Sequence, residues 1–358
     1  MALRLAVVGT GFAEQIQIPA FLIHPEIEVV AVVSRRIEKA ERVAAQYEIE
    51  HAFDRFEDLW KLDRLDAVSI ATPPLHHAPM AIEALSHGCH VLCEKPMAMN
   101  AKEAEQMLLE ARRSGKVHVI DHEFRYTPAR ALLKELVRSG ELGAIHTIRI
   151  TQYRDMWHDP LLAWNWLFDE GQGGGLLGAM GSHLIDMLLY TFGPVRKVAA
   201  LLTAGISQRP AQGGATPQKV TADDTLSLLM QLENGAQAVL QLTGVSSQNR
   251  GLEVEIHGER AAFLMRGNQE LFRLNHERIE RIDPPPALLE GLEPRSVRLS
   301  ENQRRLQPFL ALVDDWLQAI DGASPARLPS FADGLAVQRI MDAARQSSQS
   351  GQTVQISI

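Results

Sequence analysis

The stretch Leu5-Ala6-Val7-Val8-Gly9-Thr10-Gly11-Phe12 decides the fold of the first part of the chain. A short apolar strand runs into a Gly-x-Gly turn, and a helical pattern starts directly after it. Gly9 permits the tight turn, and Gly11 lets backbone approach a bound pyrophosphate at a helix N-terminus. Glu14 occupies the position where a third Gly or Ala is expected. Either Ala13 supplies the close helix–strand contact, or the helix lies slightly farther from the strand. A plain strand-to-helix turn would look similar, but this context is the one that a dinucleotide fingerprint requires.

Short β-rich runs alternate with helical patterns over the first 120 residues, which predicts a parallel sheet. One helix is introduced by Asn100 as N-cap with Glu103 three residues later, and Gly115 closes it. Another helix ends at Gly88. The predicted strands span residues 5–8, 29–33, 67–70, 90–93 and 117–120.

The character of the sequence changes after residue 121. Residues 128–138 have a helical pattern, and a last helix spans residues 332–345. Residues 207–218 are rich in Gln, Gly and Pro and are expected to form a mobile loop or hairpin tip. The predicted strands of this half span residues 144–152, 225–232, 236–242, 253–257, 261–265 and 353–356. The prediction is therefore an α/β chain: a Rossmann domain over residues 1–121, then an α+β domain over residues 122–358 with a large, mostly antiparallel open sheet.

Length and composition agree with two globular domains, because 358 residues exceed what one hydrophobic core usually supports. The net charge of −8 gives no general attraction to nucleic acid or anionic membranes. Cys89 and Cys93 lie in an apolar stretch, where a buried strand explains them better than a disulfide or metal site. No leader-like segment and no apolar run of membrane-spanning length occur, so we expect a cytoplasmic protein.

The second strand ends at Ser34-Arg35-Arg36, where an adenine ribose would lie. An acidic residue at this place would bind the ribose hydroxyls of NAD, whereas Ser34 with the two arginines suits a 2′-phosphate or a guanidinium stacked on adenine. Two solvent-facing arginines at a helix start are the alternative. The pattern favours NADP slightly over NAD.

Two further motifs follow buried strands, Thr72-Pro73 with His77 after one and Glu94-Lys95-Pro96 after the next. Ligands bind at such carboxyl ends of parallel strands. Together with Phe124-Arg125-Tyr126, the glycines 173–175 and the run Gly181-Ser182-His183-Leu184-Ile185-Asp186, these motifs make the chain resemble the Gfo/Idh/MocA oxidoreductases over nearly its whole length. The resemblance implies a nicotinamide-dependent enzyme that acts on sugars, inositols or related polyols.

The resemblance places the family's catalytic lysine on Lys95, held by its neighbours Glu94 and Pro96. A lysine there can donate a hydrogen bond to the reacting hydroxyl and stabilise developing negative charge. His183 is implied as the acid/base that relays the substrate proton. Many relatives carry an aspartate four residues earlier, where this chain has Ala179, so the proton path is less defined than the hydride path. Asp186 is expected to orient or pack.

The remaining site residues are expected around the cofactor and the substrate. The predicted cofactor-binding residues are Gly9, Gly11, Phe12, Ala13, Ser34, Arg35, Thr72, Pro73, His77, Glu94 and Lys95. The predicted substrate-binding residues, in a cleft between the domains, are Lys95, Arg125, Tyr153, Trp164 and His183, drawn from a larger cluster with Tyr126, Trp157, His158 and Trp166, whose tryptophans suit a core role equally well. His76, His77, His122 and Glu123 match no ligand spacing, so no metal is expected.

The sequence thus predicts an NAD(P)-dependent dehydrogenase of hydroxyl-bearing carbons. We expect it to form a homodimer or homotetramer through the open sheet, with no nucleic-acid or membrane partner. Two alternatives keep the same fold. One is a cofactor-binding sensor or regulator without turnover, which would not need both Lys95 and His183. The other is an enzyme whose tightly held NAD oxidises the substrate transiently.

Overall fold

The computed structural model describes residues 2–214, 216–276 and 278–356, and it divides into two compact units. The first unit comprises residues 1–126 and 291–335, and the second comprises residues 127–290 and 336–358. We expected one boundary near residue 121. Residues 291–335 instead pack with the first unit, so each unit is built from two separate segments of the chain.

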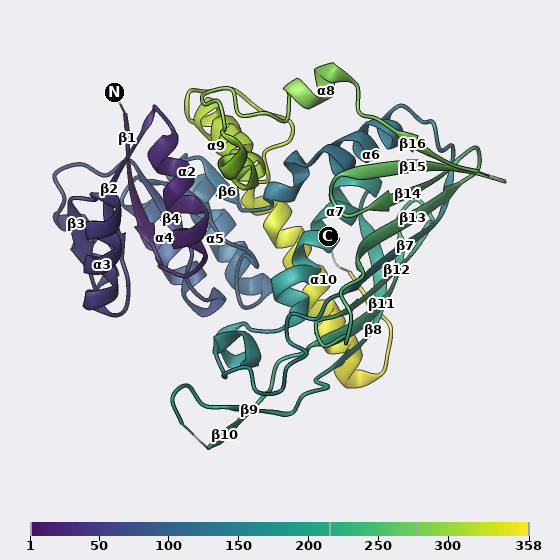
Figure 1. The fold of residues 1–358 in the computed structure, drawn as a ribbon, viewed down its shortest axis with the longest axis horizontal. Helices are drawn as coiled ribbons and strands as arrows, with labels where there is room; N and C mark the ends of the chain where they lie inside the picture. Colours follow the sequence, from purple (N-terminus) through teal and green to yellow (C-terminus); the bar gives the residue numbers. More distant parts are fainter. Residues whose placement is uncertain (1, 215, 277, 357–358) are drawn as a thin grey trace. The chain divides into compact units, whose positions relative to one another are not determined.

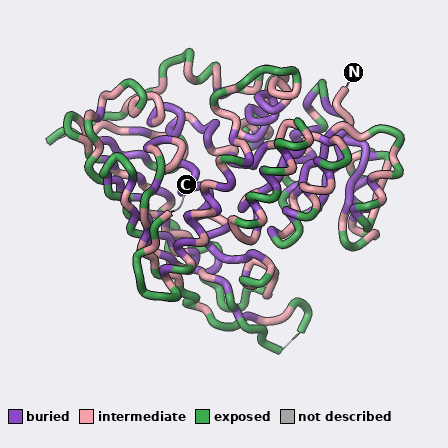
Figure 2. The backbone as a smooth tube through the Cα atoms, turned by 180° about the vertical axis from the view of Figure 1, so that it is seen from behind, coloured by how far each residue is buried: buried purple, intermediate pink, exposed green. Residues whose placement is uncertain are grey.

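The first unit is a Rossmann fold with a six-stranded parallel sheet of order β3-β2-β1-β4-β5-β6 (Figure 1). This is the order expected of a dinucleotide-binding domain. Its strands are β1 Leu3–Val8, β2 Ile27–Val33, β3 His51–Phe53, β4 Ala67–Ile70, β5 His90–Cys93 and β6 His118–Ile120. Its α-helices are α1 Phe12–Gln15, α2 Gln17–Ile23, α3 Ile37–Tyr47, α4 His77–Ser86, α5 Ala101–Ser114 and α9 Gln307–Ile320. Figure 2 shows the central strands of this sheet as buried.

Local signals in the sequence account for several element ends. Asn100 caps α5 by accepting a hydrogen bond from the backbone N–H of Glu103, and Gly115 ends that helix in the left-handed region. Strands β4 and β5 have the predicted bounds. The short strand β3 and the helix α9 were not predicted. Cys89 and Cys93 are buried and free, as expected of a strand interior.

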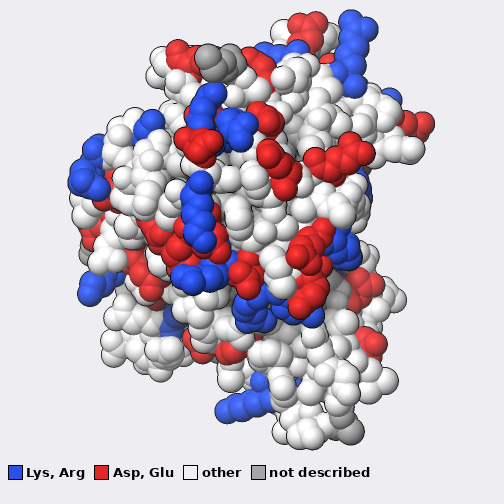
Figure 3. All heavy atoms as spheres, turned by 90° about the vertical axis from the view of Figure 1, so that its left-hand side faces the viewer, with Lys and Arg blue, Asp and Glu red and all other residues white. Residues whose placement is uncertain are grey.

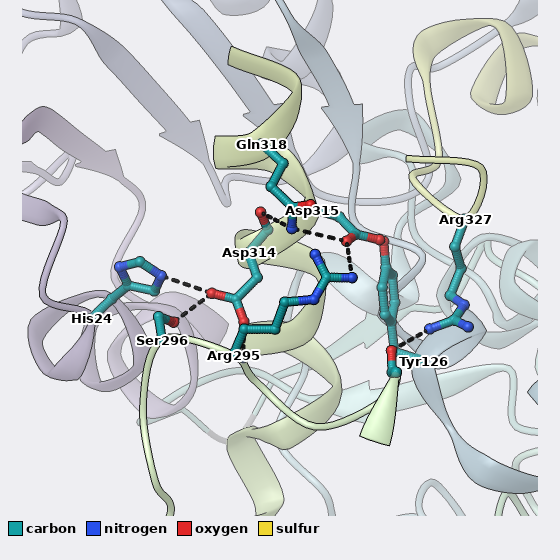
Figure 4. Close-up of polar contacts among 9 residues, drawn as sticks. His24, Tyr126, Arg295, Ser296, Asp314, Asp315, Gln318 and Arg327 are labelled. Carbon is teal, nitrogen blue, oxygen red and sulfur yellow. Dashed lines mark hydrogen bonds and ion pairs between the residues drawn. The ribbon is translucent and has the colours of Figure 1, made fainter. Parts of the chain in front are cut away.

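The segment 291–335 is attached to the first unit by polar contacts (Figure 4) and by one aromatic contact. Phe309 of α9 packs edge-on against Phe21, with ring centroids 5.4 Å apart. Asp314 accepts hydrogen bonds from His24, at 3.0 Å, and from the Ser296 hydroxyl. Although burial opposes it, these bonds hold the pKa of Asp314 below its ordinary value. The segment is therefore part of the first unit's core rather than an appendage of the second.

The second unit contains a nine-stranded sheet of order β16-β15-β14-β13-β7-β12-β11-β8-β17. Strands β7 and β12 pair in parallel and the other neighbours pair antiparallel, which confirms the predicted mostly antiparallel sheet. The strands of this sheet are β7 Ile145–Tyr153, β8 Val195–Thr203, β11 Thr225–Leu232, β12 Gln237–Thr243, β13 Gly251–Gly258, β14 Ala262–Arg266, β15 Glu270–Asn275, β16 Arg278–Ile282 and β17 Val354–Gln355.

Helices cover one face of this sheet, and its buried side chains form one hydrophobic core with them. These helices are α6 Pro128–Arg138, α7 Ser182–Phe192 and the later turns of α10 Phe331–Ser350, while the short α8 Pro286–Glu290 follows β16. The predicted tip at residues 207–218 contains a small hairpin of β9 Gln208–Pro210 and β10 Pro217–Lys219, which Figure 2 shows as largely exposed. Strands β8, β15 and β16 were not predicted.

Charged side chains of both signs are interspersed on the face drawn in Figure 3. Among the residues that the structure describes, none of the helices combines the length and the apolar character needed to span a bilayer.

Candidate active site

The Gly-x-Gly turn lies at the carboxyl ends of β1 and β4. Gly9 has a φ of +100°, and a Cβ atom there would stand 2.3 Å from the carbonyl oxygen of Ala71. Gly11 caps α1, and a Cβ atom there would meet nothing within 4 Å. Gly9 is therefore required by packing inside the protein. Gly11 instead faces open space at a helix start, where a phosphate can approach backbone N–H groups.

Ala13 and Glu14 have separate roles in the first helical turn. Ala13 is fully buried, so it supplies the close helix–strand contact that the sequence left open. Glu14 points away and forms two 2.9 Å hydrogen bonds with the guanidinium of Arg42, which lower the pKa of its carboxyl. Phe12 is 44% exposed beside the turn.

The end of β2 carries the residues expected near the adenine ribose. Ser34 is half-buried, and the Thr10 hydroxyl lies 3.2 Å from its Oγ. Arg35 and Arg36 are exposed. A hollow on the surface beside them is lined by Arg36, Glu38, Lys39 and Arg42. Three of these four side chains are cationic, which suits an anionic group of a ligand.

His77 connects the loops that follow β4 and β5. Its Nε2 lies 2.8 Å from the carbonyl oxygen of Thr72, and its Nδ1 lies 2.9 Å from that of Pro96. Burial lowers the pKa of His77 to about 4, so the ring is neutral near pH 7 and has one N–H for the two carbonyls. Thr72 and Pro73 follow β4, and the ring holds their loop to the one that carries Lys95.

Lys95 directly follows Glu94 at the carboxyl end of β5. The backbone N–H of Lys95 donates a hydrogen bond to Glu94 Oε2 at 3.3 Å, and its side chain is half-buried. Gln17 Nε2 donates to Glu94 Oε1 at 2.9 Å. The carboxyl of Asp121 lies in the same buried cluster. No motif marks Gln17 or Asp121, since the two residues come together only when β5, β6 and α2 meet.

The first unit fits a nicotinamide dinucleotide. Gly9 permits the turn, Gly11 leaves space at a helix start, and the buried hydroxyl of Thr72 has no hydrogen-bond partner among the described residues. Such an orphaned polar atom is expected where a ligand completes the hydrogen bonding.

His183 lies on α7 of the second unit, where it is 3% exposed and its carbonyl oxygen accepts a 3.1 Å hydrogen bond from Arg130. A π-helical turn over Leu177–Gly181 precedes α7, and its closing bond runs from the N–H of Ser182 to the carbonyl oxygen of Leu177. Such turns occur often at functional sites. Ala179 lies in this turn, and Asp186 is buried one turn beyond His183.

The glycines before this helix lie where neighbouring atoms leave no room for a Cβ atom. A Cβ atom on Gly174 would stand 2.5 Å from the carbonyl oxygens of Trp166 and Leu167, and one on Gly175, whose φ is +110°, would stand 2.3 Å from Asp223 Oδ1. Asp223 Oδ2 also accepts a 2.8 Å hydrogen bond from the Leu177 N–H. Asp223, which was not predicted, therefore anchors the start of the helix that carries His183.

Two of the predicted substrate residues have structural contacts. Arg125 is buried in the first unit and pairs with Asp333 at 2.9 Å. The indole N–H of Trp164 donates to the carbonyl oxygen of Lys219 at 3.1 Å and so holds the β9–β10 hairpin.

Tyr153, a predicted substrate residue, lies on strand β7. It alternates with the buried Ile150 and Gln152 on β7, and its hydroxyl donates to the exposed Gln241 at 2.9 Å. It therefore lies on the outer face of the sheet, opposite α7. Strand alternation turns its side chain away from the face that packs against His183's helix, and its role in substrate binding stays a prediction.

The neighbouring aromatic residues also contribute to packing. Trp157 is buried edge-on against Phe168, with ring centroids 5.5 Å apart, and the Tyr126 hydroxyl donates to Asp315 at 2.8 Å. His158 Nδ1 lies 3.1 Å from the carbonyl oxygen of Val245. Within the described residues, no group of three or more His, Cys, Asp or Glu side chains is placed to hold a metal ion.

Comparison with known proteins identifies the family. The model of the Gfo/Idh/MocA oxidoreductases described as their NAD-binding Rossmann fold matches residues 3–122, and the model described as their C-terminal alpha/beta domain matches residues 134–356. The chain is 32% identical over 364 residues to an oxidoreductase of Synechocystis sp., covering 97% of this chain and 94% of the relative. It is 28% identical over 380 residues to levoglucosan dehydrogenase of Pseudarthrobacter phenanthrenivorans, covering 97% and 96%. A solved levoglucosan dehydrogenase in complex with NADH and L-sorbose has a TM-score of 0.89 at 27% identity, covering 99% of both chains. The chain therefore belongs to the Gfo/Idh/MocA family of NAD(P)-dependent oxidoreductases.

Proposed function

We propose that the protein transfers a hydride between NAD(P) and a hydroxyl-bearing carbon of a sugar, inositol or related polyol, with Lys95 and His183 as its catalytic residues. The position of Lys95 carries the proposal. It follows β5 at the sheet edge that holds the Gly9–Gly11 turn, and the contacts of Glu94 and His77 hold its loop on two sides. Ligands bind at this edge in Rossmann folds.

The chain's own residues would move the proton while the hydride moves separately. A bound NAD(P) would provide the hydride acceptor for oxidation of the carbinol carbon, or the hydride donor for the reverse reduction. The Lys95 Nζ donates a hydrogen bond to the reacting oxygen and stabilises its developing negative charge. His183 accepts the hydroxyl proton during oxidation and returns it during reduction. Because Ala179 has no carboxyl, its side chain cannot orient His183 as a carboxylate would.

The named relatives support the substrate class. Besides levoglucosan dehydrogenase, the chain is 28% identical over 314 residues to scyllo-inositol 2-dehydrogenase (NADP(+)) of Bacillus subtilis, covering 84% of this chain and 89% of the relative. Both names describe cyclic polyols or their anhydrides. A panel of sugars, inositols, sugar acids and levoglucosan, incubated with NAD or NADP, tests the proposal through the absorbance of the reduced nicotinamide. We expect turnover on a member of this panel. Tight cofactor binding with no turnover on any of them would favour a sensor, and bound cofactor that free nicotinamide cannot exchange would favour transient oxidation.

We also propose that NADP binds at least as tightly as NAD. Ser34 replaces an acidic ribose ligand, and the cationic hollow of Arg36, Lys39 and Arg42 lies beside it. Glu38 partly offsets this charge, and Arg42 is already paired with Glu14. Titration of NADH and NADPH by fluorescence tests the preference. Tighter binding of NADH by tenfold or more, about 1.4 kcal/mol, would show that the arginines face solvent only.

We further propose that the outer face of the nine-stranded sheet forms a contact between subunits. Leu201, Leu229 and Val239 are 61%, 59% and 38% exposed on adjacent strands, and Leu229 lies directly opposite Val239. Monomers seldom expose neighbouring apolar side chains in this way. A symmetric dimer or a tetramer would cover them, and light scattering measures which assembly forms.

A further inference from the structure

Two polar side chains lie at the end of β7 on the inner face of the nine-stranded sheet, and the chemistry proposed above does not use them. Gln152 is 5% exposed and pairs in register with Leu242 and Leu252, which are buried in the core that also contains side chains of α7. Arg154 continues the strand beyond its last residue, since its N–H donates to the carbonyl oxygen of Thr243 at 2.9 Å. Strand alternation therefore places Arg154 on the same face as Gln152.

The protein does not complete the hydrogen bonding of either side chain. Gln152 Oε1 and Arg154 Nε are buried and have no hydrogen-bond partner among the described residues. Over the same residues, the half-buried guanidinium of Arg154 forms no ion pair with a carboxylate. By contrast, the buried guanidinium of Arg130 donates to Asn268 and to the carbonyl oxygen of His183. An amide oxygen and a cation that both lack partners are expected where a ligand completes their hydrogen bonds.

The end of β7 lies at the end of the sheet where the helix of His183 begins. A Cβ atom on Gly244, the residue after β12, would stand 3.0 Å from the ring of Trp157 and 3.6 Å from the side chain of Leu176. Trp157 follows Arg154 closely in the chain, and Leu176 directly precedes the π-helical turn before α7. At 1.5 Å per residue, His183 lies only about 10 Å along the helix from Leu176. The two polar side chains are therefore on the face and at the end of the sheet where α7 carries the proposed acid/base.

The chemistry of the two side chains indicates what they bind. A guanidinium presents a planar fork that pairs with both oxygens of a carboxylate. A carboxamide donates and accepts hydrogen bonds, as a hydroxyl does. A carboxylate of another protein subunit would suit Arg154 equally well, but a protein surface would not reach Gln152, which is only 5% exposed. A small molecule that carries a carboxylate next to hydroxyl groups fits both side chains.

We propose that Arg154 and Gln152 make the enzyme specific for a sugar acid: Arg154 binds the substrate carboxylate, and Gln152 binds a hydroxyl beside it. This inference rests on the proposed function in one respect, that the substrate meets His183. It narrows the substrate class from sugars and polyols in general to those that carry a carboxylate. A neutral sugar of the same shape leaves the guanidinium unpaired, and a site built around a polar partner rejects such an analogue.

Turnover of matched acid and neutral substrates tests the proposal. The pairs are D-glucuronate with D-glucose, D-galacturonate with D-galactose, and D-gluconate with D-glucitol, each with NAD and with NADP. In at least one pair, kcat/KM should be higher for the acid by about 10- to 100-fold, as expected of hydrogen bonds to a charged group. Arg154→Leu should bring this ratio close to one. Arg138→Leu, at an exposed arginine of α6, is the matched control and should leave the ratio unchanged. Equal kcat/KM within every pair, or a preference that survives Arg154→Leu, would overturn the proposal.

Gln152→Glu tests the same site by a different change. Side chains at i and i+2 of a strand lie about 6–7 Å apart on one face. The new carboxylate can therefore pair with the Arg154 guanidinium and take the place of the substrate carboxylate. The acid-to-neutral ratio should fall to one or below, although the positive charge of Arg154 is still present. Because this variant keeps the guanidinium and adds a partner for it, it tests the site even where Arg154→Leu does not fold. A ratio equal to that of wild type would overturn the proposal.

Calorimetric titration of the NADH-bound protein with D-glucuronate, D-galacturonate and D-gluconate supplies a readout without turnover. At least one acid should bind, and Arg154→Leu should weaken its binding by about tenfold or more. If none of the acids binds, the proposal is overturned. If an acid binds through Arg154 but no member of the pairs is turned over, the acid site is confirmed and the proposed hydride transfer is refuted. If Arg154→Leu instead converts the oligomer to monomers in light scattering and leaves the acid-to-neutral ratio unchanged, Arg154 binds a neighbouring subunit and the proposal is wrong.

Discussion

The contrast between Gly9 and Gly11 gives the sharpest prediction about the cofactor turn. In Gly9→Ala, the φ of +100° is strained for an L residue, which costs about 1–3 kcal/mol. The new Cβ would also stand 2.3 Å from Ala71 O and 2.6 Å from Ala71 C, both backbone atoms that cannot rotate away. Overpacking of this kind costs roughly a further 1–3 kcal/mol. The sum, about 2–6 kcal/mol, is a large part of the typical stability of a domain.

Hydrogen exchange measured by peptide mass spectrometry is the suitable assay, because a chain with two units need not unfold in one step. We expect Gly9→Ala to lose protection in the peptides that cover β1 and β4. Gly11→Val is the matched control, since its Cβ would meet nothing within 4 Å. It should keep wild-type protection and bind NADH at least about tenfold more weakly, or ~1.4 kcal/mol. Unchanged protection in Gly9→Ala, or unchanged NADH affinity in Gly11→Val, would refute this interpretation of the turn.

Three further predictions concern assembly, pH and cofactor choice. Leu229→Asp should convert the oligomer to monomers in light scattering, whereas Leu109→Asp, at a residue 58% exposed on α5, should not; a wild-type monomer at micromolar concentration would contradict the interface. Burial raises the pKa of Asp223 from 3.8 to about 6, so its contribution to stability is present below pH 3.8 and is lost as the pH rises through about 6. Asp223→Asn, whose side chain can still accept the Leu177 N–H, should therefore be more stable than wild type above pH 6 by about 1–3 kcal/mol in urea unfolding, with no gain at pH 4; an equal difference at both pH values would contradict this. Arg35→Ala should weaken NADPH binding more than NADH binding in fluorescence titrations. Equal losses of affinity for the two cofactors would contradict a contact between Arg35 and the 2′-phosphate.

Much of the fold could be predicted because local signals and periodicity agree in this chain. Buried parallel strands such as β4 and β5 are short apolar runs with clear ends. Asn100 and Glu103 predict the N-terminal cap of α5. Strands β15 and β16 were missed, because their charged and half-exposed residues lack a clear alternation. The assignment of residues 291–335 to the first unit was missed for another reason. It depends on contacts such as His24 with Asp314, between residues 290 positions apart.

The candidate site was predictable where a motif marks it and not where tertiary contacts build it. Lys95 and the glycines stand in motifs, so the sequence could indicate them. Asp121 and Asp223 form hydrogen bonds with residues of other elements, and the spacing of residues along the sequence does not predict such contacts. The face that Tyr153 occupies follows from strand alternation along β7, which the motifs alone do not indicate.

The kcat of Lys95→Ala, on whichever panel substrate the wild-type protein turns over, tests the central claim most directly. Lys102→Ala, at an exposed lysine on α5, serves as the matched control. We predict that Lys95→Ala lowers kcat by about two to four orders of magnitude while NADH affinity barely changes, because the lost group acts on the reacting oxygen. Near-normal kcat in Lys95→Ala would contradict the account and leave a nicotinamide-binding fold without its proposed catalytic residue.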